Sequence, residues 1–192
     1  MSDRPAEPSG ARGRLLAELR DHALVIGEVT LTSGALAQYY LDVKRAILLP
    51  AGFRALAELV APQAAEWGAT AVGGMTMGAD PIACAALAGG FAGKAFFVRK
   101  EAKAHGLSRR IEGPLLAPSD RCLLVEDTVT TGGSTIAALE ALRAEGFGVC
   151  GVLAVCDRLA GGAEAIRDAA GPSVPYRALT TIDEIFPERS DG

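Results

Sequence analysis

Short apolar runs alternate with segments of helical spacing along most of the chain. Four runs are short and rich in Val, Leu, Phe and Ala, as strands buried on both faces are: residues 69–72, 95–98, 121–125 and 149–156. Between them lie stretches whose apolar residues recur every three or four positions. This alternation predicts an α/β fold, with a mainly parallel sheet and helices on both of its faces.

Capping residues locate the helices that lie between these strands. The clearest start signals are Asp80, as an N-cap before Pro81, and the capping-box spacing of Thr181 and Glu184. One helix is predicted to follow Pro50, a second to run from Pro81 to about Leu87, and a third to centre on residues 136–142. A fourth covers residues 160–170 and is stopped by Gly171, and a short last helix opens after Thr181.

The first 45 residues depart from this alternation. A helix around residues 15–19 precedes two strand-like runs, 24–32 and 38–43, which a turn at 33–34 joins. We expect this part, residues 11–45, to form a small hood lobe near one edge of the sheet.

Length and the polarity of the two ends suggest the domain organisation. At 192 residues the chain fits one domain, which we expect at residues 11–186 with the hood as its first part. Residues 1–10 are polar, contain two prolines and are expected to be a flexible N-terminus, and residues 187–192 are expected to form a tail.

Composition narrows the class of function. The net charge of −4, from 19 basic and 23 acidic residues, argues against a nucleic-acid-binding protein. No apolar run approaches the roughly 18 residues of a membrane span, and the N-terminus lacks the apolar segment of a signal peptide. Four cysteines lie in apolar stretches without C-x-x-C spacing, so we expect reduced core residues and a cytoplasmic protein.

The most informative segment is an apolar strand that ends in two carboxylates, Glu126 and Asp127, before a loop and a helix. Loop amides and a helix N-terminus together bind anions. Acids directly before such a loop suit a phosphosugar, because they would bind sugar hydroxyls or stabilise a cationic carbon. The alternative is a solvated turn in which Ser134 caps the helix. The loop residues are Thr128, Val129, Thr130, Thr131, Gly132, Gly133 and Ser134.

A basic loop follows the run 95–98. Its cations, Arg99, Lys100, Lys103 and His105, fall within seven positions and have glycines on either side. Cations on such a loop suit a polyanionic leaving group, and a mobile loop suits closure that excludes water. The alternative is a solvated charged loop without a ligand.

Two further segments follow strands. Arg158, just after the run 149–156, would either bind a planar carboxylate or carbonyl edge or form a surface salt bridge. The glycine-rich segment 73–80 either binds an anion through its backbone amides or is a turn that ends in the cap of Asp80. Ligands bind outside the carboxyl ends of parallel strands, which is where these segments are expected.

Three segments together resemble the orotate phosphoribosyltransferases, a branch of the type I phosphoribosyltransferases. Residues 125–134, V-E-D-T-V-T-T-G-G-S, are similar to the phosphoribosyl pyrophosphate (PRPP) signature that many type I members share. The more specific parts are residues 98–106, which hold the basic loop, and residues 30–34 with 39–42. The resemblance extends over residues 15–186, nearly the whole chain.

The resemblance implies transfer of ribose 5-phosphate from PRPP to orotate, which gives orotidine 5'-monophosphate and pyrophosphate in pyrimidine (UMP) biosynthesis. It implies that Glu126 and Asp127 bind the ribose and favour its positive charge, and that residues 128–134 hold the 5'-phosphate. Thr130 and Arg158 would hold orotate.

The same resemblance implies a homodimer in which the basic loop of one subunit reaches the substrates of the other. Lys103 and His105 would neutralise the departing pyrophosphate, and Arg99 and Lys100 would also contact PRPP. Magnesium is the implied cofactor, held mainly by substrate and water rather than by protein ligands.

Two alternative functions stay open at this point. A phosphoribosyltransferase for another base, such as a purine, would share residues 126–134 but need not carry Arg158. A regulator that senses PRPP would be expected to add a basic or nucleic-acid-binding part. The chain also departs from the family, because many orotate enzymes have lysine in place of Thr32 and some in place of Gly78.

Overall fold

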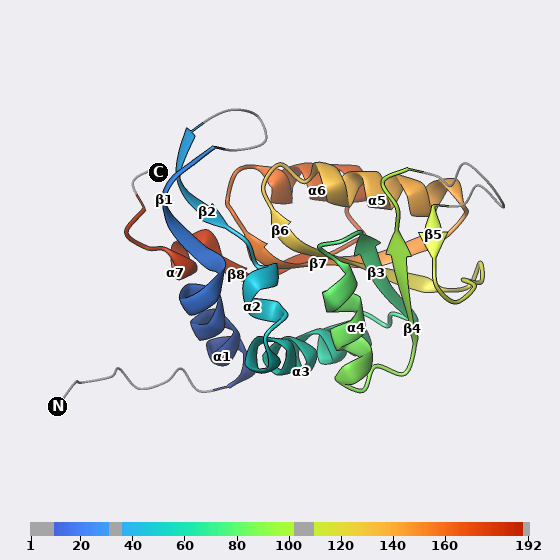
Figure 1. Ribbon diagram of the computed structural model, residues 1–192. Helices are drawn as coiled ribbons and strands as arrows, with labels where there is room; N and C mark the ends of the chain where they lie inside the picture. Colours follow the sequence, from blue (N-terminus) through green and yellow to red (C-terminus); the bar gives the residue numbers. More distant parts are fainter. Residues whose placement is uncertain (1–9, 31–35, 102–109, 190–192) are drawn as a thin grey trace.

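The computed structural model describes residues 10–30, 36–101 and 110–189. Its centre is a six-stranded sheet in the order β5-β4-β3-β6-β7-β8, in which β5 runs antiparallel to β4 and the other neighbours are parallel (Figure 1). The strands are β3 (Ala71–Met75), β4 (Lys94–Val98), β5 (Ile111–Glu112), β6 (Arg121–Val129), β7 (Gly148–Asp157) and β8 (Tyr176–Thr181).

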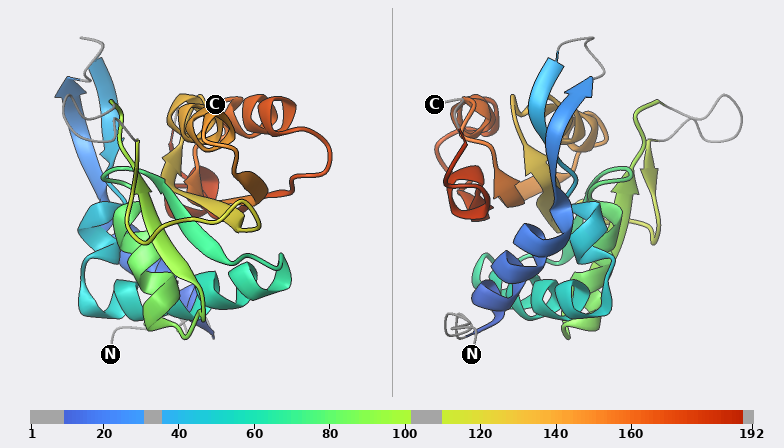
Figure 2. Two further views of the ribbon diagram at one scale, coloured as in Figure 1. Left: turned by 90° about the vertical axis from the view of Figure 1, so that its right-hand side faces the viewer. Right: turned by 60° about the vertical axis from the view of Figure 1, so that its left-hand side comes forward.

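Helices cover both faces of this sheet, which confirms the predicted α/β fold. The layer of α3 (Pro50–Glu66) and α4 (Asp80–Ala88) lies on one face, and that of α5 (Gly133–Ala144) and α6 (Gly162–Ala170) on the other (Figures 1 and 2). Along β6, Leu123 packs into the first layer and Leu124 into the second. Successive strand residues point to opposite faces, so a strand between two helical layers is apolar throughout.

Two strands extend further than predicted. Strand β3 continues through Gly73 and Gly74, which were expected to open a loop. A Cβ atom at Gly74 would lie 2.2 Å from the carbonyl oxygen of Val125, so the missing side chain lets the neighbouring strand approach. Strand β6 likewise continues to Val129, so the two acids lie inside the strand rather than after its end.

Helix starts differ from the prediction by one or two residues. The N-cap of α4 is Ala79 rather than Asp80, and α6 starts at Gly162 because Gly161 takes a positive φ of 83° at its N-cap. The predicted capping box is confirmed: Thr181 and Glu184 hydrogen-bond reciprocally at the start of α7 (Ile182–Ile185).

The N-terminal part forms a separate two-stranded antiparallel sheet, which stands apart from the main sheet as an arm (Figure 2). The turn expected at residues 33–34 lies outside the described residues. This part contains α1 (Ala11–Glu18), a π-helical turn (Leu19–Ala23), β1 (Leu24–Thr30), β2 (Leu36–Leu41) and α2 (Lys44–Ile47).

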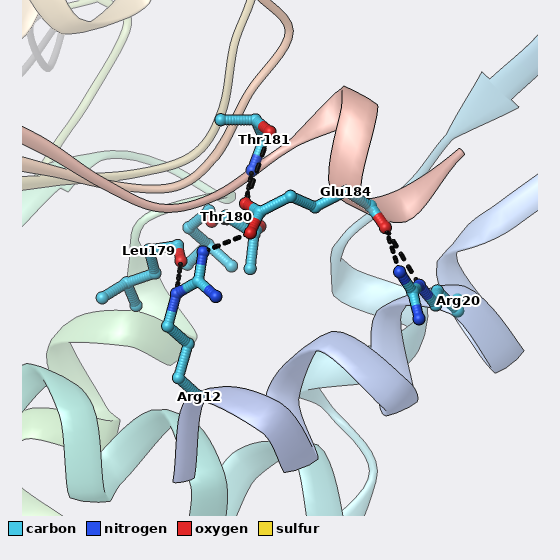
Figure 3. A network of polar contacts seen from close by, with 7 residues as sticks. Arg12, Arg20, Leu179, Thr180, Thr181 and Glu184 are labelled. Carbon is cyan, nitrogen blue, oxygen red and sulfur yellow. Dashed lines mark hydrogen bonds and ion pairs between the residues drawn. The ribbon is translucent and has the colours of Figure 1, made fainter. Parts of the chain in front are cut away.

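The N-terminal helix is joined to the C-terminal segment by polar contacts (Figure 3). Arg12 donates to the carbonyl oxygen of Leu179 at 2.9 Å and to the Glu184 carboxylate at 2.5 Å. Arg20 donates twice to the Glu184 carbonyl oxygen, at 2.9 and 2.6 Å. Segments more than 160 residues apart in sequence therefore pack as one unit.

Only some of the four cysteines lie in the core. Cys122 and Cys156 are buried and Cys150 is half-buried, but Cys84 is exposed on α4, so its expected core position is wrong. Cys84 is exposed although its neighbours Ala83 and Ala85 on the same helix are buried. Among the helices that the structure describes, none is long and apolar enough to cross a membrane.

Candidate active site

The candidate site lies where the sheet order reverses. Strand β3 pairs with β4 on one side and with β6 on the other, and the chain continues outward from both. The loops at the carboxyl ends of two adjacent parallel strands thus diverge and leave a crevice between them, which is where open α/β sheets bind ligands. The loops after β3, β4, β6 and β7 all leave the sheet at this edge.

A pocket of about 280 Å³ occupies the connection between β6 and α5. Gly132 is the N-cap of α5 with a positive φ of 81°, a conformation that a residue with a side chain rarely adopts. No side chain caps this end of α5, so the alternative in which Ser134 is the cap is wrong. The first amides of a helix lack partners within it, so the pocket offers them to an anion. Its lining is Glu126 with Thr128, Val129, Thr130, Thr131, Gly132, Gly133, Ser134 and Thr135.

The side chains of the two adjacent acids of β6 lie close to each other but have different further partners. Glu126 is 5% exposed, lines the pocket, and accepts a hydrogen bond from the Thr135 hydroxyl at 3.1 Å. Burial, and then the negative charge of Asp127, raise the pKa of Glu126 to about 8. Asp127 turns toward the hood, where its Oδ2 lies 3.1 Å from Nζ of Lys44.

Lys44 is the site residue that the sequence reasoning missed. Its ammonium group lies 2.8 Å from Asp42 Oδ1 as well as 3.1 Å from Asp127 Oδ2. Burial acts to lower the pKa of Lys44, but the two carboxylates outweigh it and raise the pKa above its usual value. The nearby Asp42 was a local signal. Nothing in the sequence near Lys44 indicated its contact with Asp127, which is 83 residues away.

Arg158 leaves the carboxyl end of β7 and reaches the hood. Its Nη2 donates to the Tyr39 hydroxyl at 2.9 Å, and the guanidinium lies 5.1 Å from the ring centre. Tyr39 is 5% exposed and packs edge-to-face on Phe186, with ring centres 5.4 Å apart. Among the described residues the side-chain partner of Arg158 is thus a tyrosine and not the carboxylate of a surface salt bridge.

The start of the basic loop faces the loop after β3. A pocket of about 650 Å³ lies between them and contains Arg99 and Lys100 together with Thr76 and Met77. Arg99 also lies 3.6 Å from the Glu112 carboxylate. The other two predicted loop residues, Lys103 and His105, fall outside the described residues, as does Thr32.

The chain is similar in sequence to known orotate phosphoribosyltransferases. No protein-family model matches the chain. It is 47% identical over 176 residues to the orotate phosphoribosyltransferase of Corynebacterium glutamicum strain R, which covers 91% of this chain and 94% of that protein. The orotate phosphoribosyltransferase of Streptomyces avermitilis is also 47% identical, over 178 residues, 91% of this chain and 96% of that one.

The fold comparison agrees with the sequence comparison. The crystal structure of the Mycobacterium tuberculosis orotate phosphoribosyltransferase in complex with PRPP has a TM-score of 0.77 and 35% identity. It covers 91% of this chain and 98% of that one. With identity near one half over nine-tenths of the chain, the same fold and a helix N-terminus open at the expected loop, this chain belongs to the orotate phosphoribosyltransferase family.

Proposed function

We propose that the edge of the sheet after β3, β4, β6 and β7 is the active site of an orotate phosphoribosyltransferase. There, ribose 5-phosphate passes from PRPP to orotate and pyrophosphate leaves, as in the synthesis of UMP. The observation that carries this proposal is the pocket of about 280 Å³ at the N-terminus of α5, with a buried carboxyl group, Glu126, in its wall. A relative with 35% identity forms a complex with PRPP, which supports the same ligand here.

The loop after β6 binds the 5'-phosphate in this proposal. Backbone amides at the start of α5 and the hydroxyls of Thr130, Thr131 and Ser134 all belong to the pocket lining. Glu126, with a pKa of about 8, is protonated at neutral pH and donates a hydrogen bond to a ribose oxygen. Asp127, beside the Lys44 ammonium, remains a carboxylate that favours positive charge on the sugar.

Arg158 and Thr130 hold orotate. The guanidinium has five N–H donors, and the contact with Tyr39 uses one nitrogen, so donors remain for the orotate carboxylate. The ring nitrogen of orotate is already nucleophilic, so the reaction needs no strong general base.

Pyrophosphate binds between the basic loop and the loop after β3. The pocket that contains Arg99, Lys100, Thr76 and Met77 supports this assignment. We propose that Lys103 and His105 complete the charge neutralisation, and that the protein is a homodimer whose basic loops act across the interface. The segment 11–45 serves as the hood over the site within one domain.

Magnesium is the cofactor in this proposal. Within the described residues, no three or more His, Cys, Asp or Glu side chains gather as a metal site. The pocket does offer carboxylate and hydroxyl oxygens, the donor class that this hard cation prefers, and Mg²⁺ retains water and substrate phosphate ligands. The ion would supply positive charge at the pyrophosphate, while the hydroxyl groups of the pocket would bind its water ligands.

A base-selectivity assay tests the function. With PRPP and Mg²⁺, pyrophosphate release is measured with orotate, adenine, guanine, hypoxanthine and uracil. We expect turnover with orotate alone, abolished or sharply reduced by Asp127→Asn and unchanged by Asp168→Asn, an exposed acid on α6. Equal or better turnover of a purine would contradict the proposal.

Subunit mixing tests the shared loop. Lys103→Ala and Asp127→Asn are each expected to be inactive, but a mixed dimer has one site with an intact Asp127 and the partner's Lys103. Activity should then reappear on subunit exchange. A mixture that stays inactive after demonstrated exchange would place the loop in its own subunit's site. Localisation in the cytoplasm stays a prediction, tested by assaying fractions of the producing cells.

A further inference from the structure

Lys44 joins the hood to the strand that carries the two acids. It is the first residue of α2, and its ammonium group lies between Asp42 at the end of β2 and Asp127 in β6. A pair with Asp42 would be enough to order the hood locally, because the two residues are neighbours in sequence. The second pair, with Asp127, bridges the hood to the main sheet.

The Asp127 carboxylate is confined from the other side by Gly78. A Cβ atom at position 78 would lie 2.5 Å from Asp127 Oδ1 and 2.7 Å from its Cγ. Both are far below an ordinary contact, so the carboxylate occupies the space that a side chain at 78 would need. Oδ1 also accepts a hydrogen bond from the Thr128 amide at 2.8 Å. Lys44 and the surface of Gly78 together define one orientation for this side chain.

The charges around Asp127 show what the cation contributes. Glu126 precedes it on the strand, and Asp42 is on the far side of Lys44, so Lys44 is the ammonium among three carboxyl groups. Asp127 is 14% exposed and its Lys44 partner 35%, so water screens the pair only in part. Without this cation, the Asp127 carboxylate would lose the positive charge beside it and the contact that orients Oδ2.

We propose that Lys44 is a positioning residue for the transfer reaction, which holds the Asp127 carboxylate against Gly78 in the orientation that meets the developing positive charge of the sugar. This inference rests on the proposed role of Asp127. It adds that the hood, through Lys44, takes part in the chemical step and is not only a cover over the base. Lys44 acts through Asp127 and needs no contact with either substrate.

The test separates positioning from structural support by kinetics. Lys44→Met removes the charge and keeps the aliphatic stem, and Lys44→Arg keeps the charge. Positioning predicts that kcat of Lys44→Met falls roughly 10- to 100-fold while the KM for orotate stays within about twofold. Damage to the hood would instead raise the KM for orotate, because Tyr39, the partner of Arg158, lies on β2, the strand that precedes Lys44 in the chain. Lys44→Arg should recover most of kcat.

Gly78→Ala supplies an independent arm, since its Cβ would displace the same carboxylate. We expect kcat to fall, and the double variant Lys44→Met/Gly78→Ala to fall no further than the worse single variant, because both changes act on Asp127. Arg14→Met is the matched control. It removes an exposed cation on α1 that pairs with Glu58 on α3 at 2.6 Å, and kcat should not change.

The outcomes are distinct. A fully active Asp127→Asn would overturn the proposed role of Asp127 and this inference with it. An inactive Asp127→Asn beside a Lys44→Met with unchanged kcat would overturn the inference alone. So would a higher KM for orotate without loss of kcat, or independent, multiplicative losses in the double variant.

Discussion

The Arg158 guanidinium donates a hydrogen bond of 2.9 Å to the Tyr39 hydroxyl and lies 5.1 Å from the centre of the same ring. Arg158 follows β7 of the main sheet and Tyr39 lies on β2 of the hood, 119 residues earlier. Phe186, which follows the last helix, packs edge-to-face against the Tyr39 ring. Three distant segments thus fix one guanidinium, which we assign to orotate.

Removing the Tyr39 hydroxyl should loosen this guanidinium. Tyr39→Phe keeps the ring and its contact with Phe186, so stability should be nearly unchanged. The KM for orotate should rise about 3- to 10-fold, since a hydrogen bond to a charged group contributes roughly 1 kcal/mol or more. The KM for PRPP should not change. Tyr40→Phe is the matched control, because Tyr40 is 41% exposed on the same strand. Equal KM values for Tyr39→Phe and the wild type would separate Tyr39 from the base site.

Removing Arg158 itself should have a larger effect. Orotate differs from uracil by a carboxylate, so selectivity for orotate requires a paired cation. We expect Arg158→Ala to weaken the interaction with orotate by about 2 kcal/mol or more, seen in its KM, and to affect PRPP far less. If only the KM for PRPP rises, Arg158 belongs to the phosphate side of the site.

Glu126 should make stability depend on pH. Burial, followed by the charge of Asp127, raises its pKa to about 8, so between pH 4.5 and 8 the folded protein binds a proton that the unfolded chain has released. Its contribution is therefore full below pH 4.5 and is lost as pH rises through about 8. The glutamine of Glu126→Gln does not titrate. The free energy of unfolding of this variant relative to wild type, measured with urea, should therefore be higher at pH 8 than at pH 5.

Between pH 5 and pH 8, the difference in unfolding free energy between Glu126→Gln and wild type should change by at least about 1 kcal/mol. Glu140→Gln, an exposed position on α5, serves as the control and should keep the wild-type pH dependence. Parallel pH profiles for Glu126→Gln and wild type would mean that Glu126 titrates near its ordinary value.

Glu184 should matter for stability and not for catalysis. Its side chain closes the capping box with Thr181 and accepts from Arg12, and its carbonyl oxygen accepts from Arg20 (Figure 3). Glu184→Ala should lower the free energy of unfolding by about 1–2 kcal/mol. Glu188→Ala, an exposed acid beyond the helix, should change it little. A Glu184→Ala variant with wild-type stability would show that the capping box and arginine contacts contribute little.

Local patterns were sufficient where the physical cause is local. The apolar runs predicted β4 and β7 closely, because a strand between two helical layers needs apolar residues on both faces. Thr181 and Glu184 formed the capping box that their spacing predicts. The glycine- and threonine-rich loop after β6 did surround a helix N-terminus, since Gly132 supplies the positive φ that starts α5.

Short or edge elements escaped the sequence reasoning. Strand β5 has two residues and α2 has four, too few for a period to show. Strand β8 lies at the sheet edge and is only partly buried, and its run 176–181 contains Arg177 and two threonines, so it lacks continuous apolar character. The exposure of Cys84 depends on which side of α4 the sheet covers, which an apolar neighbourhood in sequence does not specify.

The candidate site divides in the same way. The sequence alone identified the two acids, the phosphate loop, the basic loop and Arg158. Their residue types indicate the chemistry, and their positions near the ends of apolar runs indicate the edge of the sheet at which they lie. The tertiary structure alone decided that Glu126 is buried against α5 while Asp127 meets Lys44, and that Tyr39 holds Arg158. The last two contacts join residues 83 and 119 positions apart, and they depend on how the hood packs on the sheet, a property of the whole fold.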